Sequence, residues 1–453
     1  MRQFSTARLV NPLSENLTIE KVVKNDLCTR CGVCDPICPH DSIKFDGNFY
    51  PWVDWSTCTN CGLCELICPG LEFDFKKQYQ KMFAVDHPIH MPEGYFKKAY
   101  IGYSNHNKIK EKGSSGGLVT QILVYLLGEK MVDAVVLVSD NEHDPTAPIP
   151  KIARTEEEII AGAGSKYSVV PITKILNEVR RTREKIAFVG VACQIHGLRR
   201  LEELNKRLSR NVKLVIGLAC NATLENDVIK DLLWRKGLTK SQVKQITYRN
   251  GTFPGKLTAT LKDGNKVQLM KHGMCESYGR LRLLYEPPRC HLCSDYTAEF
   301  ADISVADIML RGSNGEYLFS DGRSVALCRT EAGLKVMEDM EKAGVINVSP
   351  LSSDLVQKNF RKMILVKKIL PYQMIRKLKN KKKLHPIYNT NGLPPTLRHI
   401  LYEMVRTPIY RFYSFPVVRK IGVALLFSKY GEHLTNLKFI WKKLKAKRYK
   451  EPC

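Results

Sequence analysis

One cysteine pattern occurs twice near the N-terminus, and it limits what this part of the chain can fold into. Residues 28–39 read CTRCGVCDPICP, and residues 58–69 read CTNCGLCELICP. In such a pattern three thiolates on a tight loop bind three irons of a cuboidal cluster, and the fourth ligand comes from the other copy. The repeat therefore predicts a ferredoxin-like module that holds two 4Fe-4S clusters and passes single electrons.

Because each cluster takes three ligands from one copy and the fourth from the other, every cysteine of the repeat can be assigned to one cluster. One cluster takes Cys28, Cys31, Cys34 and Cys68, and the other takes Cys58, Cys61, Cys64 and Cys38. A pair of zinc sites is the alternative, but zinc ligands come as two spaced pairs rather than as triplets followed by Cys-Pro. The alternating segments 42–45 and 71–75 predict a small strand beside each cluster.

Composition narrows the setting in which this chemistry takes place. The 453-residue chain is 44% apolar, which suits two or three folded units. Its first residues lack the apolar core of a secretory signal, and no apolar run approaches the roughly 20 residues that span a bilayer. We therefore expect a cytoplasmic protein, in which fifteen cysteines favour metal or redox chemistry over disulfides.

From about residue 98 the pattern changes to apolar runs that alternate with amphipathic helices. Residues 99–104, 113–117, 118–130 and 132–140 predict strand, loop, helix and strand, and KIAFVGVAC and VKLVIGLAC each lead from a strand into a helix. Residues 242–270 interrupt this order with a hairpin signal around Asp263-Gly264. The predicted fold class is an α+β ferredoxin-like module, then an α/β domain with a β-hairpin insertion, then a basic, mainly helical C-terminal extension.

Four further cysteines could form a third metal site. Cys290 and Cys293 make a C-x2-C pair, while Cys193 and Cys220 each end a predicted strand. Strand ends are where α/β domains place ligands. Buried thiols and an incidental pair are the alternative, because free cysteine is a common core residue. Spacing alone leaves both interpretations open.

Several segments between residues 97 and 350 resemble the coenzyme F420 hydrogenase/dehydrogenase β-subunit family. The matching segments are GSSGGLVTQILVYLL (113–127), GAGSKYSVV (162–170), FVGVACQIHGLRRL (188–201), YRNGTFPGKL (248–257), CHLCSDYTAEFADISVADI (290–308) and SVALCRTEAGL (324–334). The resemblance implies an oxidoreductase that holds FAD and a 4Fe-4S cluster, with Cys193, Cys220, Cys290 and Cys293 as the ligands of that cluster.

Domain boundaries and two departures from the family pattern follow. We expect an N-terminal arm over 1–20, the two-cluster ferredoxin domain over 21–80, the family-like FAD and 4Fe-4S domain over 95–350 and the basic extension over 355–453. The family usually reads G-T-P-C where this chain has GVAC (190–193), and S-V-G-D where it has SVAD (304–307). Loss of a proline and a glycine changes local backbone freedom near the expected deazaflavin pocket.

Two loops are the candidates for flavin binding. A glycine-serine loop precedes a predicted helix, where free amides and hydroxyls can hold a phosphate, and its residues are Ser114, Ser115, Gly116 and Gly117. A second loop offers Ser165, a lysine at 166 for pyrophosphate or reduced flavin, and an aromatic ring at Tyr167. A flexible turn and a surface lysine are the simpler alternatives. No G-x-G-x-x-G fingerprint opens a helix, so a nicotinamide-binding module is not supported.

The predicted function joins these parts. Coenzyme F420 exchanges a hydride, a 4Fe-4S cluster takes one electron, and FAD can do both, so an F420-dependent oxidoreductase with three 4Fe-4S clusters would convert one into the other. No side chain is assigned as acid or base; His106, His196 and Asp307 lie in suggestive segments only. The alternatives are an electron-carrier subunit without its own substrate site, or a same-fold reductase of a tetrapyrrole or a polysaccharide-pathway substrate. A second redox protein or subunit is expected to dock at the ferredoxin module.

The C-terminal extension carries most of the charge. From residue 357 onward 24 Lys and Arg face 3 acidic residues, so 21 of the net +26 charges lie there. Basic runs at 376–383 and 442–450 bracket an apolar, aromatic stretch, which suits an interfacial helix on an anionic membrane surface. A solvated helical appendage or a docking arm for an acidic partner is the alternative. Cys453 lacks a C-a-a-X context, and no nucleic acid partner is expected.

Overall fold

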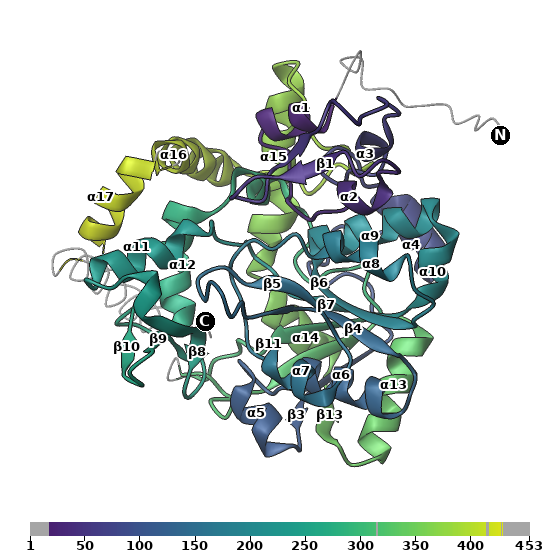
Figure 1. The fold of residues 1–453 in the computed structure, drawn as a ribbon, viewed down its shortest axis with the longest axis vertical. Coiled ribbons are helices and arrows are strands. Elements are labelled where there is room, and N and C mark those ends of the chain that lie inside the picture. Colours follow the sequence, from purple (N-terminus) through teal and green to yellow (C-terminus); the bar gives the residue numbers. More distant parts are fainter. Residues whose placement is uncertain (1–17, 314–315, 414–415, 427, 429–453) are drawn as a thin grey trace.

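The computed structural model describes residues 18–313, 316–413, 416–426 and 428 (Figure 1). Most of the expected N-terminal arm, the second basic run at 442–450 and Cys453 lie outside these residues. Within the described ranges, no helix is both long enough and apolar enough to cross a membrane.

The cysteine repeat of the N-terminal module is a structural repeat. Its elements are α1 (Ile19–Lys24), α2 (Cys34–Ile37), β1 (Ile43–Phe45), β2 (Pro51–Val53) and α3 (Leu63–Leu66). Arg30 and Asn60 occupy equivalent positions, with φ of 53° and 54°. The backbone N–H of each donates to the sulfur two residues earlier, on Cys28 and Cys58, at 3.4 Å. The two copies therefore fold alike around their first cysteine.

Only one of the two strands expected in this module forms. β1 matches the segment predicted at 42–45 and pairs antiparallel with β2. The strand predicted at 71–75 is wrong, because Glu72 makes a single parallel bridge with Ile387 and the helix α4 (Phe75–Phe83) begins immediately afterwards. The Asp74 side chain accepts a hydrogen bond from the backbone of Lys77 and caps that helix, which ends the extended segment.

A mixed eight-stranded sheet forms the centre of the molecule, with the order β13-β3-β12-β11-β7-β6-β4-β5. The strands are β3 (Lys98–Ser104), β4 (Ala134–Ser139), β5 (Ile149–Ala153), β6 (Ile186–Val191), β7 (Val212–Leu218), β11 (Ile303–Asp307), β12 (Ser324–Cys328) and β13 (Ile346–Pro350). β11, β7, β6 and β4 run parallel, and antiparallel strands flank them on both sides. The expected α/β fold is confirmed, and the structure shows that its centre is a large mixed sheet.

Helices cover both faces of the sheet. They are α5 (Asn107–Lys112), α6 (Leu118–Gly128), α7 (Glu156–Ala161), α8 (Leu176–Val179), α9 (Ala192–Leu204), α10 (Lys206–Asn211) and α13 (Glu331–Lys342). Alternate strand residues feed two cores: Phe188 packs on the α9 side and Val189 on the α6 and α13 side. The helix α5 was not predicted; it stands between β3 and the glycine-serine loop.

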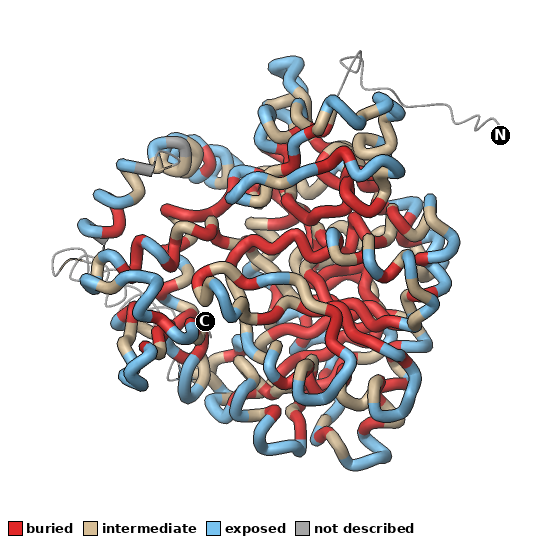
Figure 2. Tube along the Cα trace, viewed as in Figure 1, coloured by how far each residue is buried: buried red, intermediate tan, exposed pale blue. Residues whose placement is uncertain are grey.

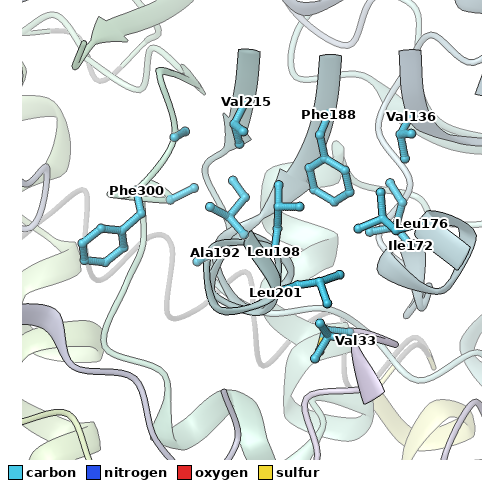
Figure 3. Packing of buried hydrophobic residues seen from close by; sticks show 14 of the residues in the cluster. Val33, Val136, Ile172, Leu176, Phe188, Ala192, Leu198, Leu201, Val215 and Phe300 are labelled. Atoms are coloured by element: carbon cyan, nitrogen blue, oxygen red, sulfur yellow. The ribbon is translucent and has the colours of Figure 1, made fainter. Parts of the chain in front are cut away.

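Helix α9 lies between the sheet and the N-terminal module. Figure 3 shows it end-on, with Phe188 and Val215 of the strands on one side and Val33 of the cysteine repeat on the other. A side-chain carbon at Gly197 of α9 would lie 3.1 Å from Val33 and 3.4 Å from the sulfur of Cys31. The small residue therefore lets the repeat pack directly on this helix.

The insertion at 242–270 is larger than a hairpin. β8 (Val243–Asn250), β9 (Lys256–Leu261) and β10 (Lys266–Gln268) form a separate three-stranded antiparallel sheet. It packs with α11 (Asp227–Arg235) and α12 (Met274–Tyr285) around a core of its own. The predicted turn at Asp263-Gly264 joins β9 to β10.

The first part of the C-terminal extension packs against the body of the molecule, and its residues 367–373 are buried there. It comprises α14 (Ser353–Phe360), a π-helical turn η4 (Ile364–Ile369) and α15 (Leu370–Asn380). In Figure 1 α15 runs from the level of the central sheet towards the N-terminal module, and Tyr372 and Tyr388 belong to the main core. Because charge dominated the sequence pattern here, the apolar residues that anchor this segment were not recognised. By contrast, α16 (Leu397–Tyr413) and α17 (Pro416–Leu426) are largely exposed or half-buried (Figure 2).

Candidate functional site

Four cysteines surround a hollow at the outer end of the N-terminal module. Cys58, Cys61, Cys64 and Cys38 line it, and they are the four residues assigned to one cluster from the sequence. The hollow encloses about 480 Å³ of non-atom space, part of it open to solvent. Cys61 is exposed, and Trp55 at the rim is 54% exposed. This site therefore faces the surface.

A second group of four cysteines lies deeper in the module. Cys28, Cys34 and Cys68 belong to its buried core, and Cys31 is also buried. Burial, together with the neighbouring thiol of Cys68, raises the pKa of Cys28 to about 12. Burial likewise raises the pKa of Cys68 to about 12, with Cys31 as its principal neighbouring thiol. Thiols so close and so buried become thiolates only when a cation or a cationic cluster core is present.

A third group brings together cysteines that are far apart in the sequence. One hollow of about 710 Å³, including its part open to solvent, is lined by Cys193, Cys220, Cys290 and Cys293. Cys193 lies in the first turn of α9 and Cys220 lies just beyond β7, whereas Cys290 lies in the 3-10 turn η3 (Pro288–Leu292). Burial raises the pKa of Cys193 well above its ordinary value, and the other three thiols of the group add to the shift.

None of these groups has the geometry of a single-ion site. Among the described residues, no three His, Cys, Asp or Glu side chains converge closely enough to hold one metal ion. The outer and third groups each line a hollow.

The three groups follow one another through the molecule. The thiol of Cys64 in the outer group contributes to the raised pKa of Cys34 in the inner group, after burial and the nearer thiols of its own group. Cys31 of the inner group contributes in the same way to Cys193 of the third. The hollow of the third group is also lined by Cys28. The inner group therefore lies between the other two.

Buried cations beside the third group were missed by the sequence reasoning. Arg289 lines its hollow and donates from Nε to the carbonyl of Leu27 at 3.0 Å and from Nη2 to the hydroxyl of Tyr388 at 2.9 Å. Lys367 of η4 lines the same hollow. Burial alone would lower the pKa of Lys367, but the neighbouring thiols outweigh burial and raise it. Only the fold brings these residues to the cysteines, so no local pattern marks them.

The two loops predicted for flavin binding touch each other. The backbone N–H of Ser165 donates to Oγ of Ser114 at 2.7 Å. Ser115 donates to the carbonyl of Arg323 at 2.6 Å, and the N–H of Gly116 donates to Oγ of Ser324 at 3.2 Å. Gly117 has φ of 73° and precedes α6, whose first N–H groups have no helical acceptor.

Lys166 is held inside its own loop. Its ammonium donates to the carbonyls of Gly162 and Ala163 at 2.7 and 3.1 Å and lies 3.6 Å from Asp140. Burial lowers its pKa, although Asp140 opposes the shift. The side chain is therefore positioned by the loop rather than free at the surface.

Tyrosines connect these loops to the third cysteine group. Tyr167 packs against Tyr248 and Tyr278, with ring centroids 5.5 and 5.0 Å away. The Tyr278 hydroxyl hydrogen-bonds both backbone groups of Ala222, a residue that lines the cysteine hollow. Aromatic rings therefore lead from the loop at 164–167 to the hollow of the third group.

The three residues singled out in suggestive segments have different surroundings. His196 is buried in α9, where Nε2 lies 2.9 Å from Asp295 and the ring stacks on Phe73. Asp307 accepts a hydrogen bond from Arg249 at 2.7 Å. His106 is the exposed residue before α5. None of them is placed here as an acid or base.

Comparisons with known proteins cover the central part of the chain. Residues 99–177 match the N-terminal model, and residues 183–354 the C-terminal model, of the coenzyme F420 hydrogenase/dehydrogenase beta subunit. The chain is 31% identical to a coenzyme F420 hydrogenase subunit beta of Methanococcus voltae over 59% of its own length and 91% of that protein. It is 25% identical to a coenzyme F420-dependent sulfite reductase of Methanocaldococcus jannaschii over 76% of its own length, but spans only 51% of that protein.

One solved structure supports the fold. A chain from the xenon-derivatised F420-reducing NiFe hydrogenase complex of Methanosarcina barkeri matches with a TM-score of 0.51 and 21% identity. The match covers 67% of the present chain and 99% of that chain.

Proposed function

Because the chain belongs to the coenzyme F420 hydrogenase/dehydrogenase beta-subunit family, a family of oxidoreductases, we propose that it is an F420-dependent flavin and iron-sulfur oxidoreductase. In this proposal FAD and three 4Fe-4S clusters supply the conversion between hydride transfer at a deazaflavin and single-electron transfer. The ferredoxin-like module at 21–80, the family-like domain at 95–350 and the extension from 355 form one enzyme.

The observation that carries this proposal is the order of the sites. The sites adjoin one another in space in a fixed order. The outer cysteine group is followed by the inner group, the third group, the tyrosines, and finally the loops at 113–117 and 164–167. A chain that only carried electrons between two surfaces would not require the tyrosines and the two loops that follow the third group. The residues fit the implied groups: each cysteine set supplies four thiols, and the two loops place hydroxyls, amides and a buried lysine together.

The protein's own part is to hold and insulate these groups. Cys28 and Cys58 each accept a backbone N–H bond at 3.4 Å, an interaction that stabilises a thiolate ligand. The Ser114–Ser165 bond fixes one loop against the other, and the tyrosine hydroxyls are tied to Ser168 and to Ala222. No described side chain is assigned a proton transfer.

The direct test is anaerobic purification followed by mixing with reduced coenzyme F420. We expect about twelve iron atoms per chain from three clusters, one FAD, recovery of the absorbance of oxidised F420 and simultaneous bleaching of the clusters. Iron and sulfide without stoichiometric flavin would favour an electron carrier instead. Protein replete in flavin and clusters that leaves reduced F420 unchanged would point to a different substrate on the same fold.

The electron partner is proposed to dock at the outer cysteine group. Trp55 lines the hollow of this group and is 54% exposed. Trp52 of β2 and Leu66 of α3, in the same module, are 45% and 46% exposed, although aromatic and aliphatic side chains of this size are usually covered. An exposed tryptophan and an exposed cysteine, Trp55 and Cys61, line the same hollow, which suits a redox protein or subunit that binds transiently.

A membrane surface is the proposed partner of α16 and α17. Leu397, Leu401 and Val405 of α16 are 72%, 55% and 64% exposed, and their spacing of four residues places them in one stripe. Val417, Ile421 and Leu425 form the same stripe on α17, with exposures of 72%, 54% and 63%. The surrounding basic residues would each add about 1 kcal/mol on anionic lipid.

Flotation with anionic and neutral vesicles tests this partner. Replacing Leu401 and Val405 by serine should reduce recovery with anionic vesicles, because the exposed stripe loses apolar area without loss of core. Leu204→Ser on α9, also an exposed leucine at 47%, is the matched control. Equal recovery of the two variants and the wild type would exclude this membrane face. Truncation at residue 350 is unsuitable as a test, since it also removes the buried helix α15.

A further inference from the structure

Two consecutive lysines in the π-helical turn η4 are buried, and they have different partners. Lys368 lies 2.6 Å from Glu299, and both side chains are fully inaccessible to solvent. Lys367 is only 2% exposed and lines the hollow of the third cysteine group. Across the described residues, Lys367 has no carboxylate within ion-pair distance and no side-chain hydrogen bond.

The other cations near this hollow are already satisfied by protein groups. Arg282 is paired with Glu286 at 2.6 Å, and Arg289 donates to Leu27 and Tyr388. The groups that share the hollow with the Lys367 side chain include the four thiols of Cys193, Cys220, Cys290 and Cys293. A buried ammonium without an anionic partner is strongly unfavourable in a folded protein. Its position in the hollow therefore favours a negative charge there.

A 4Fe-4S cluster with four thiolate ligands supplies that charge, because four thiolates outweigh the charge of the iron-sulfide core. We propose that Lys367 is a positioning residue that provides the counter-charge for the cluster on Cys193, Cys220, Cys290 and Cys293 and favours its reduced form. This inference rests on the cluster assignment of the proposed function. Reduction adds one electron to the cluster, and no bond forms or breaks, while Lys367 keeps its proton.

Lys367 belongs to the C-terminal extension, so the proposed counter-charge comes from the extension. The matches to the family end at residue 354, and η4 begins at Ile364. The extension thus reaches back into the family-like domain and places a cation beside its cluster. Wide π-helical turns recur at functional sites, where they alter the direction of side chains relative to a regular helix.

The test compares midpoint potentials of the third cluster in anaerobic holoprotein by reductive titration with dithionite, followed by electron paramagnetic resonance. Lys367→Met should lower the ratio of reduced to oxidised cluster at least tenfold at a fixed potential, which is a downward shift of the midpoint potential of at least about 59 mV for one electron. Lys367→Arg should restore most of the wild-type potential, because it keeps the charge. Lys362→Met, which removes an exposed lysine from the same segment, should change nothing.

The outcomes separate this inference from the proposed function. A third cluster that is present in all variants with one unchanged potential would overturn the role of Lys367 alone. Loss of the third cluster in both Lys367→Met and Lys367→Arg would also overturn it, since side-chain shape rather than charge would then hold the site. Loss in Lys367→Met with retention in Lys367→Arg supports it. Wild-type protein without a third cluster would overturn the cluster assignment and the inference with it.

Discussion

Replacing Lys368 by methionine should destabilise the whole molecule, because Lys368 forms a buried ion pair that links three parts of the chain. Lys368 belongs to the C-terminal extension, and Glu299 to the family-like domain. The Tyr79 hydroxyl from the N-terminal region donates to the same carboxylate, and Nε2 of His87 lies 3.6 Å away. Both charges of the pair are fully buried, so neither can turn to water when the other is removed.

The expected size follows from this burial. Removing one member of a buried pair costs about 3–5 kcal/mol, which lowers the folding equilibrium constant on the order of a hundredfold to several thousandfold. The double variant Glu299→Gln/Lys368→Met removes both charges while the amide oxygen can still accept from Tyr79. We expect it to recover more than half of the lost stability, because replacing a whole buried pair is often close to neutral.

Proteolysis in increasing urea, under anaerobic conditions with clusters retained, measures these free energies of unfolding. Lys362→Met, on an exposed lysine of the same segment, is the control and should lie within about 0.5 kcal/mol of the wild type. A Lys368→Met variant as stable as this control would refute the reasoning. So would a double variant less stable than the single one, because the two charges would then not be coupled.

The pH dependence gives a second check with a defined sign. Burial alone would raise the pKa of Glu299, but Lys368 and His87 outweigh it and hold the pKa well below the ordinary value. A carboxyl with a depressed pKa in the folded state stabilises above its unfolded pKa of about 4.3 and loses that contribution as pH falls through the folded value. The stability difference between wild type and double variant should thus not shrink between pH 7 and about pH 5. A difference that shrinks across that range would contradict the assignment.

Three further changes test the cysteine sites. Cys293→Ala should remove about four of the expected twelve irons and leave the electron paramagnetic resonance signals of the two N-terminal clusters. Cys275→Ala, outside the three groups, should keep all the iron. Equal iron in the two variants would contradict the third site. Gly32→Ala places a carbon 2.8 Å from the carbonyl of Pro171 at φ of 95° and should lower iron content and stability. Gly47→Ala, with no atom within 4 Å, should do neither. A Gly32 variant with wild-type iron content and stability would show that the loop can relax. Trp55→Ala should slow electron delivery to an external acceptor protein but not reduction of the clusters by dithionite, and an equal effect on both would rule out docking at this rim.

The residues that the sequence made predictable are those whose role depends on local spacing. The cysteine repeat has a fixed spacing because a tight loop must reach three irons, and its two copies fold alike around Arg30 and Asn60. Strands β6 and β7 could be predicted because continuous apolar runs mark buried parallel strands. The grouping of Cys193 and Cys220 with the C-x2-C pair followed from the family resemblance, and the structure brings these four thiols to one hollow.

The remaining features depend on contacts between distant segments. The strand expected at 71–75 failed because Asp74 caps α4, and the chain pairs there with Ile387 instead. The segment at 364–380 belongs to a strongly basic extension for which the sequence predicted a membrane-surface helix or a solvated appendage, yet Lys367 and Lys368 are buried in it. A buried lysine looks like any other lysine in a sequence, since its partner is supplied by a residue far along the chain.

This segment also explains how the cysteine groups keep a fixed arrangement. Met374, Ile375 and Leu378 of α15 pack against the core of the N-terminal module that contains Cys28 and Cys68. The same helix packs on η3, the turn that carries Cys290, and the preceding turn supplies Lys367 to the hollow beside it. One continuous element thus touches both the inner and the third cysteine groups. Movement of the module relative to the sheet would have to break the apolar contacts of α15 and the Lys368–Glu299 pair together, so the extension is the part of this chain that fixes the spacing along which electrons would pass.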